Sequence, residues 1–220
     1  VLRGLNVDLN DILGLHFFLA SDFRIWQFFT YMFMHSGFTH ILLNMFMLWM
    51  FGMVVENVWG PKKFLLYYIV TGIGAGLCQE LAQYANYMAE GLNRYQYIAT
   101  EMGRIPMENY LNLWTTVGAS GAVYGVLLAF GLTFPNERMF IIPIPIPLKA
   151  KWIIMGSIAM ELFSAMSTTN DGVAHLAHLG GMLFGFLLIR YWRKHPYSGG
   201  TFGMDKGHQF FDNMRHNWEN

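Results

Sequence analysis

Two side chains that could perform catalysis lie close to the starts of two apolar runs. Ser120 lies in "GASGAVYGVLLAFGL" (118–132), and His178 lies in "VAHLAHLGGMLFGFLLIRYW" (173–192). A serine hydroxyl becomes a useful nucleophile when a base removes its proton, and a neutral imidazole is the usual base near pH 7. The pair therefore predicts nucleophilic hydrolysis with Ser120 as nucleophile and His178 as general base.

A third group of polar residues offers donors for such a reaction. Attack on an amide builds an oxyanion, which needs fixed hydrogen-bond donors. His40 and Asn44 are four residues apart, so they share one face of a helix, and His35 lies shortly before them. With the backbone N–H of Ser120, the side chains of His40 and Asn44 predict an oxyanion-binding site.

Each of these residues also has an ordinary structural interpretation. A serine in a membrane helix often bonds its own backbone, and a histidine there is often a hydrogen-bonded structural residue. The α/β-hydrolase elbow G-x-S-x-G is excluded, because Ala122 stands where its second glycine would be, and the sequence predicts no strand before Ser120. The case for catalysis therefore depends on the set of residues rather than on any one of them.

We predict no metal and no cofactor. His175 and His178 are three residues apart, but the H-E-x-x-H motif is absent and no carboxylate accompanies them at ligand spacing. Asp171 falls in a predicted outer loop, and Glu161 falls on a different predicted helix. We interpret Glu161 as a buried, hydrogen-bonded structural acid, with a functional role as the alternative. A Ser–His dyad is therefore the minimal catalytic set.

The composition of the chain indicates a membrane protein. Of its 220 residues, 54% are hydrophobic and only 13% are charged, whereas a soluble domain carries about 25% charged residues. The formal net charge of zero gives no reason to expect a nucleic-acid partner. The single cysteine, Cys78, excludes an internal disulfide and a cysteine-based metal cage.

Five apolar segments are predicted to form helices that span or nearly span a bilayer, which takes about 20 residues. Residues 86–114 are predicted to form a long polar loop or a partly interfacial helix. Residues 195–220 are predicted to form a polar tail. The five segments are 39–58, 64–84, 117–134, 152–166 and 173–192.

Basic residues predict the orientation of these segments. Loops that carry more Lys and Arg stay in the cytoplasm, and here they follow the first, third and fifth segments. This places the C-terminus in the cytoplasm. Ser120, His178 and the His40 group then share one depth near the extracytoplasmic face, which the apolar pattern alone does not require.

Small residues are predicted to bring the two catalytic helices together. Gly121 and Gly125 are four apart on one segment, and Gly181 and Gly185 are four apart on another. Such spacing lets membrane helices pack closely. Tyr124, one helical turn after Ser120, is predicted to pack against the His178 imidazole and hold its orientation.

Three motifs in this order resemble the rhomboid intramembrane serine proteases: "HSGFTHILLN" (35–44), "GASGAVYG" (118–125) and "AHLGGMLFG" (177–185). The resemblance covers the chain from about Trp26 to Trp192. It implies that Ser120 is the nucleophile, that His178 is the base and that His40 and Asn44 bind the oxyanion. It also implies that Tyr124 stacks on His178 and that Gly181 and Gly185 let the last core helix meet the serine helix.

The resemblance implies an all-α membrane bundle with a six-helix core, of which five spans are visible and the first is missing. The expected parts are an outer loop (1–27), a rhomboid membrane domain (28–194) and a cytoplasmic tail (195–220). The implied activity is cleavage of peptide bonds in or near transmembrane segments of other proteins. The partners are then such substrates and the lipid bilayer, and the expected location is a bacterial inner membrane.

Two other functions are alternatives for a helical membrane protein of this kind. A catalytically inactive relative that binds membrane proteins usually lacks the serine or the histidine, and both Ser120 and His178 are present. A transporter or channel predicts charged groups at mid-membrane on several helices, and only Glu161 fits that pattern.

Overall fold

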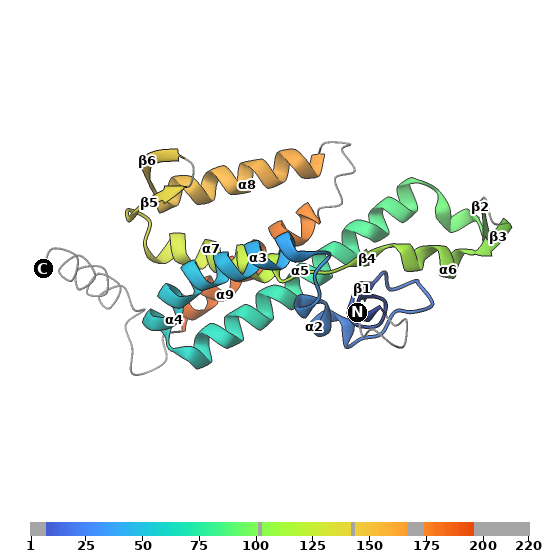
Figure 1. Ribbon diagram of the computed structural model, residues 1–220, viewed down its shortest axis with the longest axis horizontal. Coiled ribbons are helices and arrows are strands. Elements are labelled where there is room, and N and C mark those ends of the chain that lie inside the picture. The colour runs from blue at the N-terminus through green and yellow to red at the C-terminus, as the bar shows by residue number, and fades with distance from the viewer. Residues whose placement is uncertain (1–7, 101–102, 142–143, 167–173, 196–220) are drawn as a thin grey trace, which may run out of the picture.

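Helices make up most of the protein. The computed structural model describes residues 8–100, 103–141, 144–166 and 174–195. The apolar segments lie on five long or medium helical stretches, which Figure 1 shows running roughly along the long axis of the molecule. They are Phe38–Trp59, which consists of α3 (Phe38–Met47), the π-helical turn η2 (Leu48–Gly52) and α4 (Met53–Trp59), then α5 (Pro61–Ala89), α7 (Ser120–Thr133), α8 (Ala150–Met166) and α9 (His175–Lys194).

By length and apolarity, two helices in the described part of the chain are able to cross a bilayer. They are Phe38–Trp59, with 22 residues, and Pro61–Ala89, with 29. Ser120–Thr133 is apolar but shorter. The larger set of five spans therefore remains a prediction.

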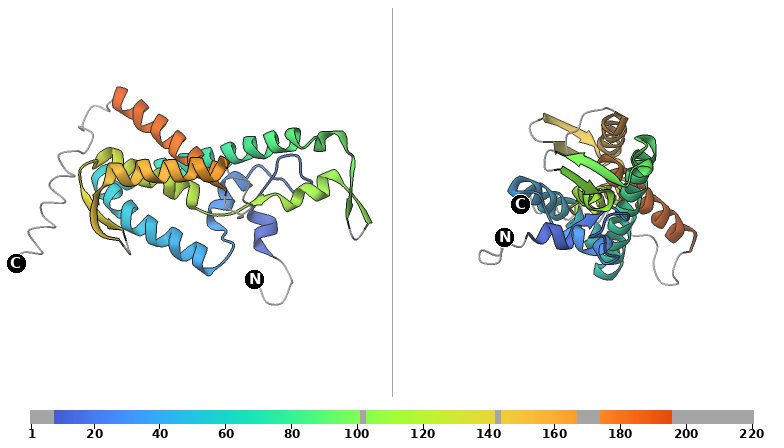
Figure 2. Two further views of the ribbon diagram at one scale, coloured as in Figure 1. Left: turned by 90° about the horizontal axis from the view of Figure 1, so that it is seen from above. Right: turned by 90° about the vertical axis from the view of Figure 1, so that its right-hand side faces the viewer.

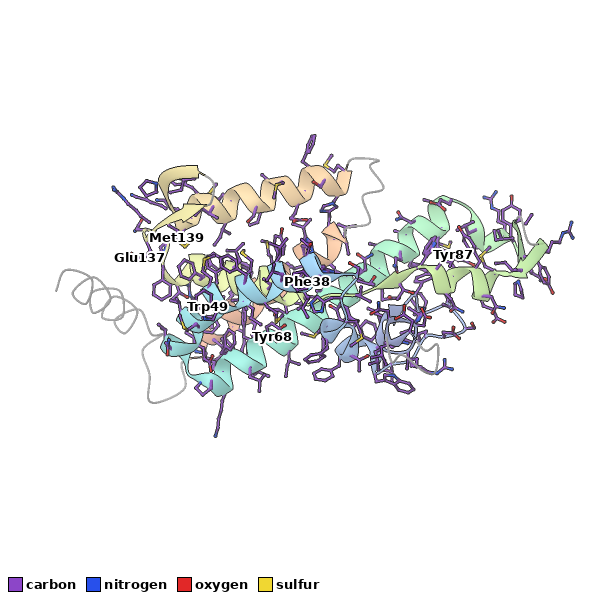
Figure 3. All side chains as sticks on the ribbon, in the orientation of Figure 1. Phe38, Trp49, Tyr68, Tyr87, Glu137 and Met139 are labelled. Atoms are coloured by element: carbon purple, nitrogen blue, oxygen red, sulfur yellow. The ribbon has the colours of Figure 1, made fainter. Side chains whose placement is uncertain are left out.

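Large apolar side chains on the outside of the helices favour lipid as the surrounding medium. Phe38 and Trp49, both labelled in Figure 3, are 79% and 62% exposed, and Phe163 on α8 is 76% exposed. Water would make such a continuous apolar surface costly. A bilayer removes that cost, because acyl chains replace water around these side chains.

Helices α5, α7 and α9 form the centre of the bundle, and small residues allow their close contact. Gly72, Gly74 and Gly76 are buried on α5, and the last two let Phe184 and Leu15 approach the helix. The Tyr67 hydroxyl donates to the carbonyl of Gly125 over 2.8 Å and so joins α5 to α7. The largest cluster of buried side chains is built from these helices together with η2, α4 and α8.

The prediction of a wholly helical fold was incomplete, because the connecting segments that the structure describes contain three short antiparallel strand pairs. The predicted 86–114 loop contains one of them, after α5 has continued to Ala89. In Figures 1 and 2 this hairpin and the hairpin before α8 lie at opposite ends of the molecule. The pairs are β1 (Leu15–His16) with β4 (Thr115–Thr116), β2 (Tyr97–Thr100) with β3 (Gly103–Pro106), and β5 (Arg138–Ile141) with β6 (Ile144–Lys149).

The residues before α3 form an ordered segment that packs against α5. Gln27 is buried, and its amide bonds the carbonyls of Ile12 and Asp22. The Tyr31 hydroxyl donates to the carbonyl of Gly72 over 2.6 Å. The predicted boundaries 1–27, 28–194 and 195–220 stay predictions, and residues 196–220 lie outside the described part. The remaining elements are α1 (Leu9–Leu13), α2 (Gln27–Thr30), η1 (Tyr31–Phe33), η3 (Leu92–Arg94), α6 (Met107–Tyr110) and η4 (Leu111–Leu113).

Candidate active site

Ser120 and His178 lie within hydrogen-bonding distance of each other. Ser120 is the first residue of α7, and His178 lies in the first turn of α9. Ser120 Oγ is 2.8 Å from His178 Nε2, so the hydroxyl donates to the imidazole when Nε2 is unprotonated. This is the distance at which a base can take the hydroxyl proton.

The contact between α7 and α9 is made at a pair of glycines. A Cβ placed on Gly181 would overlap the backbone carbonyl of Gly121, and a Cβ on Gly121 would overlap the Ala75 side chain of α5. Gly125 and Gly185 have different neighbours, because they lie against Thr71 and Tyr67 of α5. The two helices therefore touch backbone to backbone one turn from the candidate dyad.

Tyr124 lies flat against the imidazole of His178. The ring centroids are 4.3 Å apart, and the ring planes are inclined by only 9°. An offset stack of this kind restricts rotation of the imidazole about its Cβ–Cγ bond. It therefore keeps Nε2 directed toward Ser120.

His40 approaches the serine from α3, and a neighbouring hydroxyl orients its ring. His40 Nδ1 is 3.0 Å from Ser36 Oγ. If Ser36 donates to Nδ1, the proton of a neutral imidazole is on Nε2, which lies beside Gly118 and the start of α7. Ser36 is a residue whose positioning role was not predicted, since a serine four residues before a histidine carries no distinctive signal.

Asn44 and His35 lie near His40 but differ in their contacts. Asn44 is buried, and its side-chain amide donates to the carbonyl of His40 over 2.9 Å. The His35 ring meets the His40 ring edge to face at a centroid distance of 5.1 Å, and neither nitrogen of His35 has a hydrogen-bond partner among the described residues. Burial, and secondly the His40 ring, lowers the pKa of His35, which precedes α3.

The segment before Ser120 is held in place by contacts with the N-terminal part of the chain. Strand β4 pairs with β1 with Leu15 opposite Thr116 and His16 opposite Thr115. The backbone N–H of Gly118 donates to the carbonyl of Tyr31 over 3.0 Å. Two separate contacts therefore determine where α7 begins. As the first residue of the helix, Ser120 has a backbone N–H with no partner inside α7.

Gly118 is required in its place by both its backbone and its surroundings. Its φ of +133° is strained for any residue with a Cβ, and an added Cβ would lie 2.8 Å from His40 Cε1. We expect Gly118→Ala to displace the His40 ring and to lower the rate of the peptide hydrolysis predicted from the sequence by about 100-fold, the lower end of the loss for one oxyanion donor.

The measurement is kcat/KM on a transmembrane peptide. Gly103→Ala is the matched control, because Gly103 also has a positive φ of +118° but has no described atom near its missing Cβ. Equal losses in the two variants would contradict the role given to His40.

An open cavity of about 1040 Å³ leads to these groups. It is lined by residues of α3, α7, α8 and α9 and by the end of α5. Its walls mix apolar side chains with hydroxyls and amides, so an extended peptide would find both apolar contacts and hydrogen-bond partners there. The residues that matter here are Ser36, His40, Asn44, Ser120, Tyr124 and His178, together with Ile153, Ser157 and Met160 of α8.

Glu161 on α8 lies beside His178, which the sequence did not indicate. Its Oε2 is 2.7 Å from Nδ1 of His175 and 3.1 Å from Nδ1 of His178. The signal that could have found it is its charge within an otherwise apolar helix, since such residues are usually functional. Asp171, the other acid weighed, lies outside the described residues.

Glu161, His175 and His178 could also hold a metal ion, since they offer three ligand atoms within 4.8 Å of one another. The carboxylate already lies at hydrogen-bonding distance from His175. This contact explains the cluster without an ion, so the expectation of no metal stays a prediction.

A hydroxyl, an imidazole and possible oxyanion donors, gathered among apolar helices, define a candidate serine-hydrolase site inside a membrane protein. Residues 22–195 match the Rhomboid domain, and the chain belongs to the rhomboid family. It is thus an integral membrane protein.

The chain is similar to rhomboid proteins from a bacterium, from mitochondria and from chloroplasts. The chain is 28% identical over 166 residues to the rhomboid protease AarA of Providencia stuartii and 28% identical over 164 residues to the human presenilin-associated rhomboid-like protein, mitochondrial. It is 26% identical over 219 residues to rhomboid-like protein 11, chloroplastic, of Arabidopsis thaliana. The matches cover 74%, 72% and 86% of this chain, in the same order.

The chain spans only part of these relatives: 54% of AarA, 36% of the human protein and 64% of the Arabidopsis protein. Two of these relatives are named as mitochondrial and chloroplastic proteins, and AarA is bacterial. The bacterial inner membrane therefore stays a prediction for this chain.

Proposed function

We propose that this protein is an intramembrane serine endopeptidase that cleaves peptide bonds in or near transmembrane segments of other membrane proteins. The observation that carries the proposal is the 2.8 Å distance between Ser120 Oγ and His178 Nε2. The proposal is also supported by membership of the rhomboid family, which includes the rhomboid protease AarA.

The reaction begins when Ser120 Oγ attacks the carbonyl carbon of the substrate. His178 Nε2 takes the hydroxyl proton, and the carbonyl oxygen becomes an oxyanion. His40, the Asn44 amide and the backbone N–H of Ser120 are the proposed donors to that oxyanion. His178 then gives its proton to the leaving nitrogen, and an acyl-enzyme on Ser120 remains.

Water completes the cycle. It attacks the acyl carbon after His178 removes one of its protons, and Ser120 regains its hydrogen when the acid product leaves. The polar rim of the cavity, at Ser36 and Thr39, gives a wet path to the site. The substrate has to unwind locally, because a helix keeps its carbonyls in internal hydrogen bonds.

The proposed setting is a bilayer crossed by five helices of this chain, with the site near the extracytoplasmic face and residue 195 on the cytoplasmic side. Arg193 and Lys194 in the last turn of α9 support this orientation by the positive-inside rule. The proposed partners are transmembrane substrates and lipid, and no cofactor takes part.

Covalent labelling tests the proposal. The protein is purified in detergent, treated with a fluorophosphonate probe and digested, and the modified residue is identified by mass spectrometry. We expect the label on Ser120, and we expect Ser120→Ala to remove at least about 99% of it, because no other group replaces an activated hydroxyl.

Ser157→Ala is the matched control, since Ser157 lines the same cavity but bonds the Ile154 carbonyl. It should label like the unmodified protein. Unchanged labelling of Ser120→Ala, or no labelling of the folded unmodified protein, would refute the proposal and favour a binding role without catalysis.

A further inference from the structure

We propose that Glu161 is a positioning residue for the general base, so that α8 supplies a third member to the Ser120–His178 pair. The inference rests on the proposed function. It goes beyond the dyad, because it assigns a role in catalysis to a helix that carries neither reacting group.

The three side chains lie in one chain of contacts. Ser120 Oγ is 2.8 Å from Nε2 of His178, and Nδ1 on the other side of the same ring is 3.1 Å from Glu161 Oε2. If Nε2 accepts from the serine, the neutral ring carries its proton on Nδ1 and directs it toward the carboxylate. Glu161 therefore favours the tautomer in which His178 can act as a base.

The geometry of the second contact leaves room for tightening. It is a short ion-pair contact but not a well-aligned hydrogen bond, and His178 Nδ1 has no hydrogen-bond partner among the described residues. Catalytic hydrogen bonds are often loose without substrate and tighten in the reacting complex. The distance of 3.1 Å already suits a hydrogen bond, so a small change in the orientation of the ring or the carboxylate is enough to align the pair.

Glu161 also contacts two side chains that lie beside His178. His175 Nδ1 lies 2.7 Å from Glu161 Oε2, and the Tyr124 side chain also interacts with the carboxylate. Tyr124 is the ring that stacks on His178. One buried carboxylate thus contacts both the imidazole and the aromatic ring that limits its rotation.

The charge of Glu161 suits this position during the reaction. When Ser120 Oγ bonds to the substrate carbon, its proton moves to His178 Nε2 and the ring becomes a cation. The carboxylate stabilises that cation and keeps its own charge, because no proton moves to it. The proton on Nε2 later leaves with the amine product.

Several titratable groups face His178 or pack beside it, and the test has to separate them. They are His40 on α3, Tyr124 on α7, Glu161 on α8 and His175 on α9, with Cys78 on α5 packed against Gly180. Of these groups, the carboxylate is the anion. Removing this negative charge is therefore expected to move the acid limb of the pH–rate profile to lower pH, and replacing one of the other groups is not.

The test is the pH–rate profile of Glu161→Gln on a transmembrane peptide. We expect kcat to fall by about 10- to 100-fold. A change of about one to two units in the proton affinity of the base corresponds to a factor of about 10 to 100. We expect the acid limb of the profile to move to lower pH by about one unit or more, because the protonated imidazole loses its counter-charge. KM should change little, since Glu161 is not among the described residues that line the cavity.

Glu80→Gln is the matched control. Glu80 is another buried acid of a long helix, but it accepts from the backbone N–H of Phe18 and does not face the site. This variant should lose thermal stability without moving the acid limb. An acid limb that moves equally in both variants, or in neither, would overturn the inference.

A measurement on the unmodified protein covers the case in which Glu161→Gln does not fold. The ¹⁵N spectrum of labelled histidine should show His178 as the Nδ1–H tautomer at high pH, and the Nε2–H tautomer would overturn the inference. Probe labelling at Ser120 reports the proposed function separately. Labelling without a shift of the acid limb refutes the role of Glu161 alone, whereas failure to label refutes the proposed function itself.

Discussion

Replacing His178 by alanine is expected to lower the rate of peptide hydrolysis by 10³-fold or more, on the order of what the loss of a catalytic base costs serine proteases. The reason is the 2.8 Å contact between Nε2 and Ser120 Oγ, since without it the hydroxyl keeps its proton. The variant also removes the imidazole on which Tyr124 stacks, which leaves space beside the Tyr124 ring. The measurement is kcat with a transmembrane peptide in detergent or lipid.

Substrate binding provides the control for this variant. The cavity keeps its other lining residues, so the variant should bind the peptide with nearly unchanged affinity and melt close to the temperature of the parent. His16→Ala is a comparison of the same type, because His16 is a buried histidine outside the Ser120–His178 contact, whose ring bonds Asn112, Asp11 and the cavity-lining Thr115. Comparable loss of kcat in both variants would mean that buried histidines matter here for folding and not for proton transfer.

Replacing Gly181 by alanine is expected to separate the helices that carry the two reacting groups. The added Cβ has no room against the Gly121 carbonyl, so α7 and α9 have to move apart. A displacement of about 1 Å at reacting groups can cost 100-fold in rate, so we expect kcat to fall by about 10²- to 10³-fold. Overpacking of this kind also lowers the free energy of unfolding by about 1–3 kcal/mol.

The measurements are kcat, the rate of probe labelling at Ser120 and the thermal midpoint. Gly156→Ala is the matched control, because it adds the same methyl group to α8 at a position with no described atom within 4 Å. It should leave kcat and labelling unchanged. If Gly181→Ala labels at the normal rate, close contact of the two helices is not what brings the serine to the histidine.

The sequence predicted the long helices well because their apolar runs are long and contain few charged residues. The run that begins near Ser120 became α7, and the run around His178 became α9. The strand pairs were missed because each is short and lies in a polar connection, where pairing depends on a partner strand and not on a repeating pattern. The two residues of β1, for example, pair with residues about 100 positions later.

The meeting of Ser120 and His178 was expected from orientation and motif, whereas the approach of Glu161 was not. Helix α7 is apolar on every side, so no polar face indicates which neighbour each residue meets. Helix α8 carries one buried acid, and its rotation about its own axis determines whether that acid faces α9 or lipid. The apolar pattern of one sequence does not reveal that rotation. Glu161 was therefore interpreted as a structural residue.

The glycines show the same limit at a finer scale. Spacing predicted that Gly121, Gly125, Gly181 and Gly185 serve close packing, but it could not assign their partners. Gly121 and Gly181 lie against each other, while Gly125 and Gly185 lie against Thr71 and Tyr67. The reason is that α5 fills part of the groove between α7 and α9, which only the assembled bundle determines.

The pairing of β1 with β4 has a consequence for the order in which the chain folds. His16 and Thr115 are 99 residues apart, and closing so long a loop is entropically unfavourable until the intervening helices have been placed. We therefore expect the segment that leads into Ser120 to settle after the bundle has formed. The Ser120 hydroxyl is then expected to become reactive only once His178, 58 residues later in the chain, has been placed beside it.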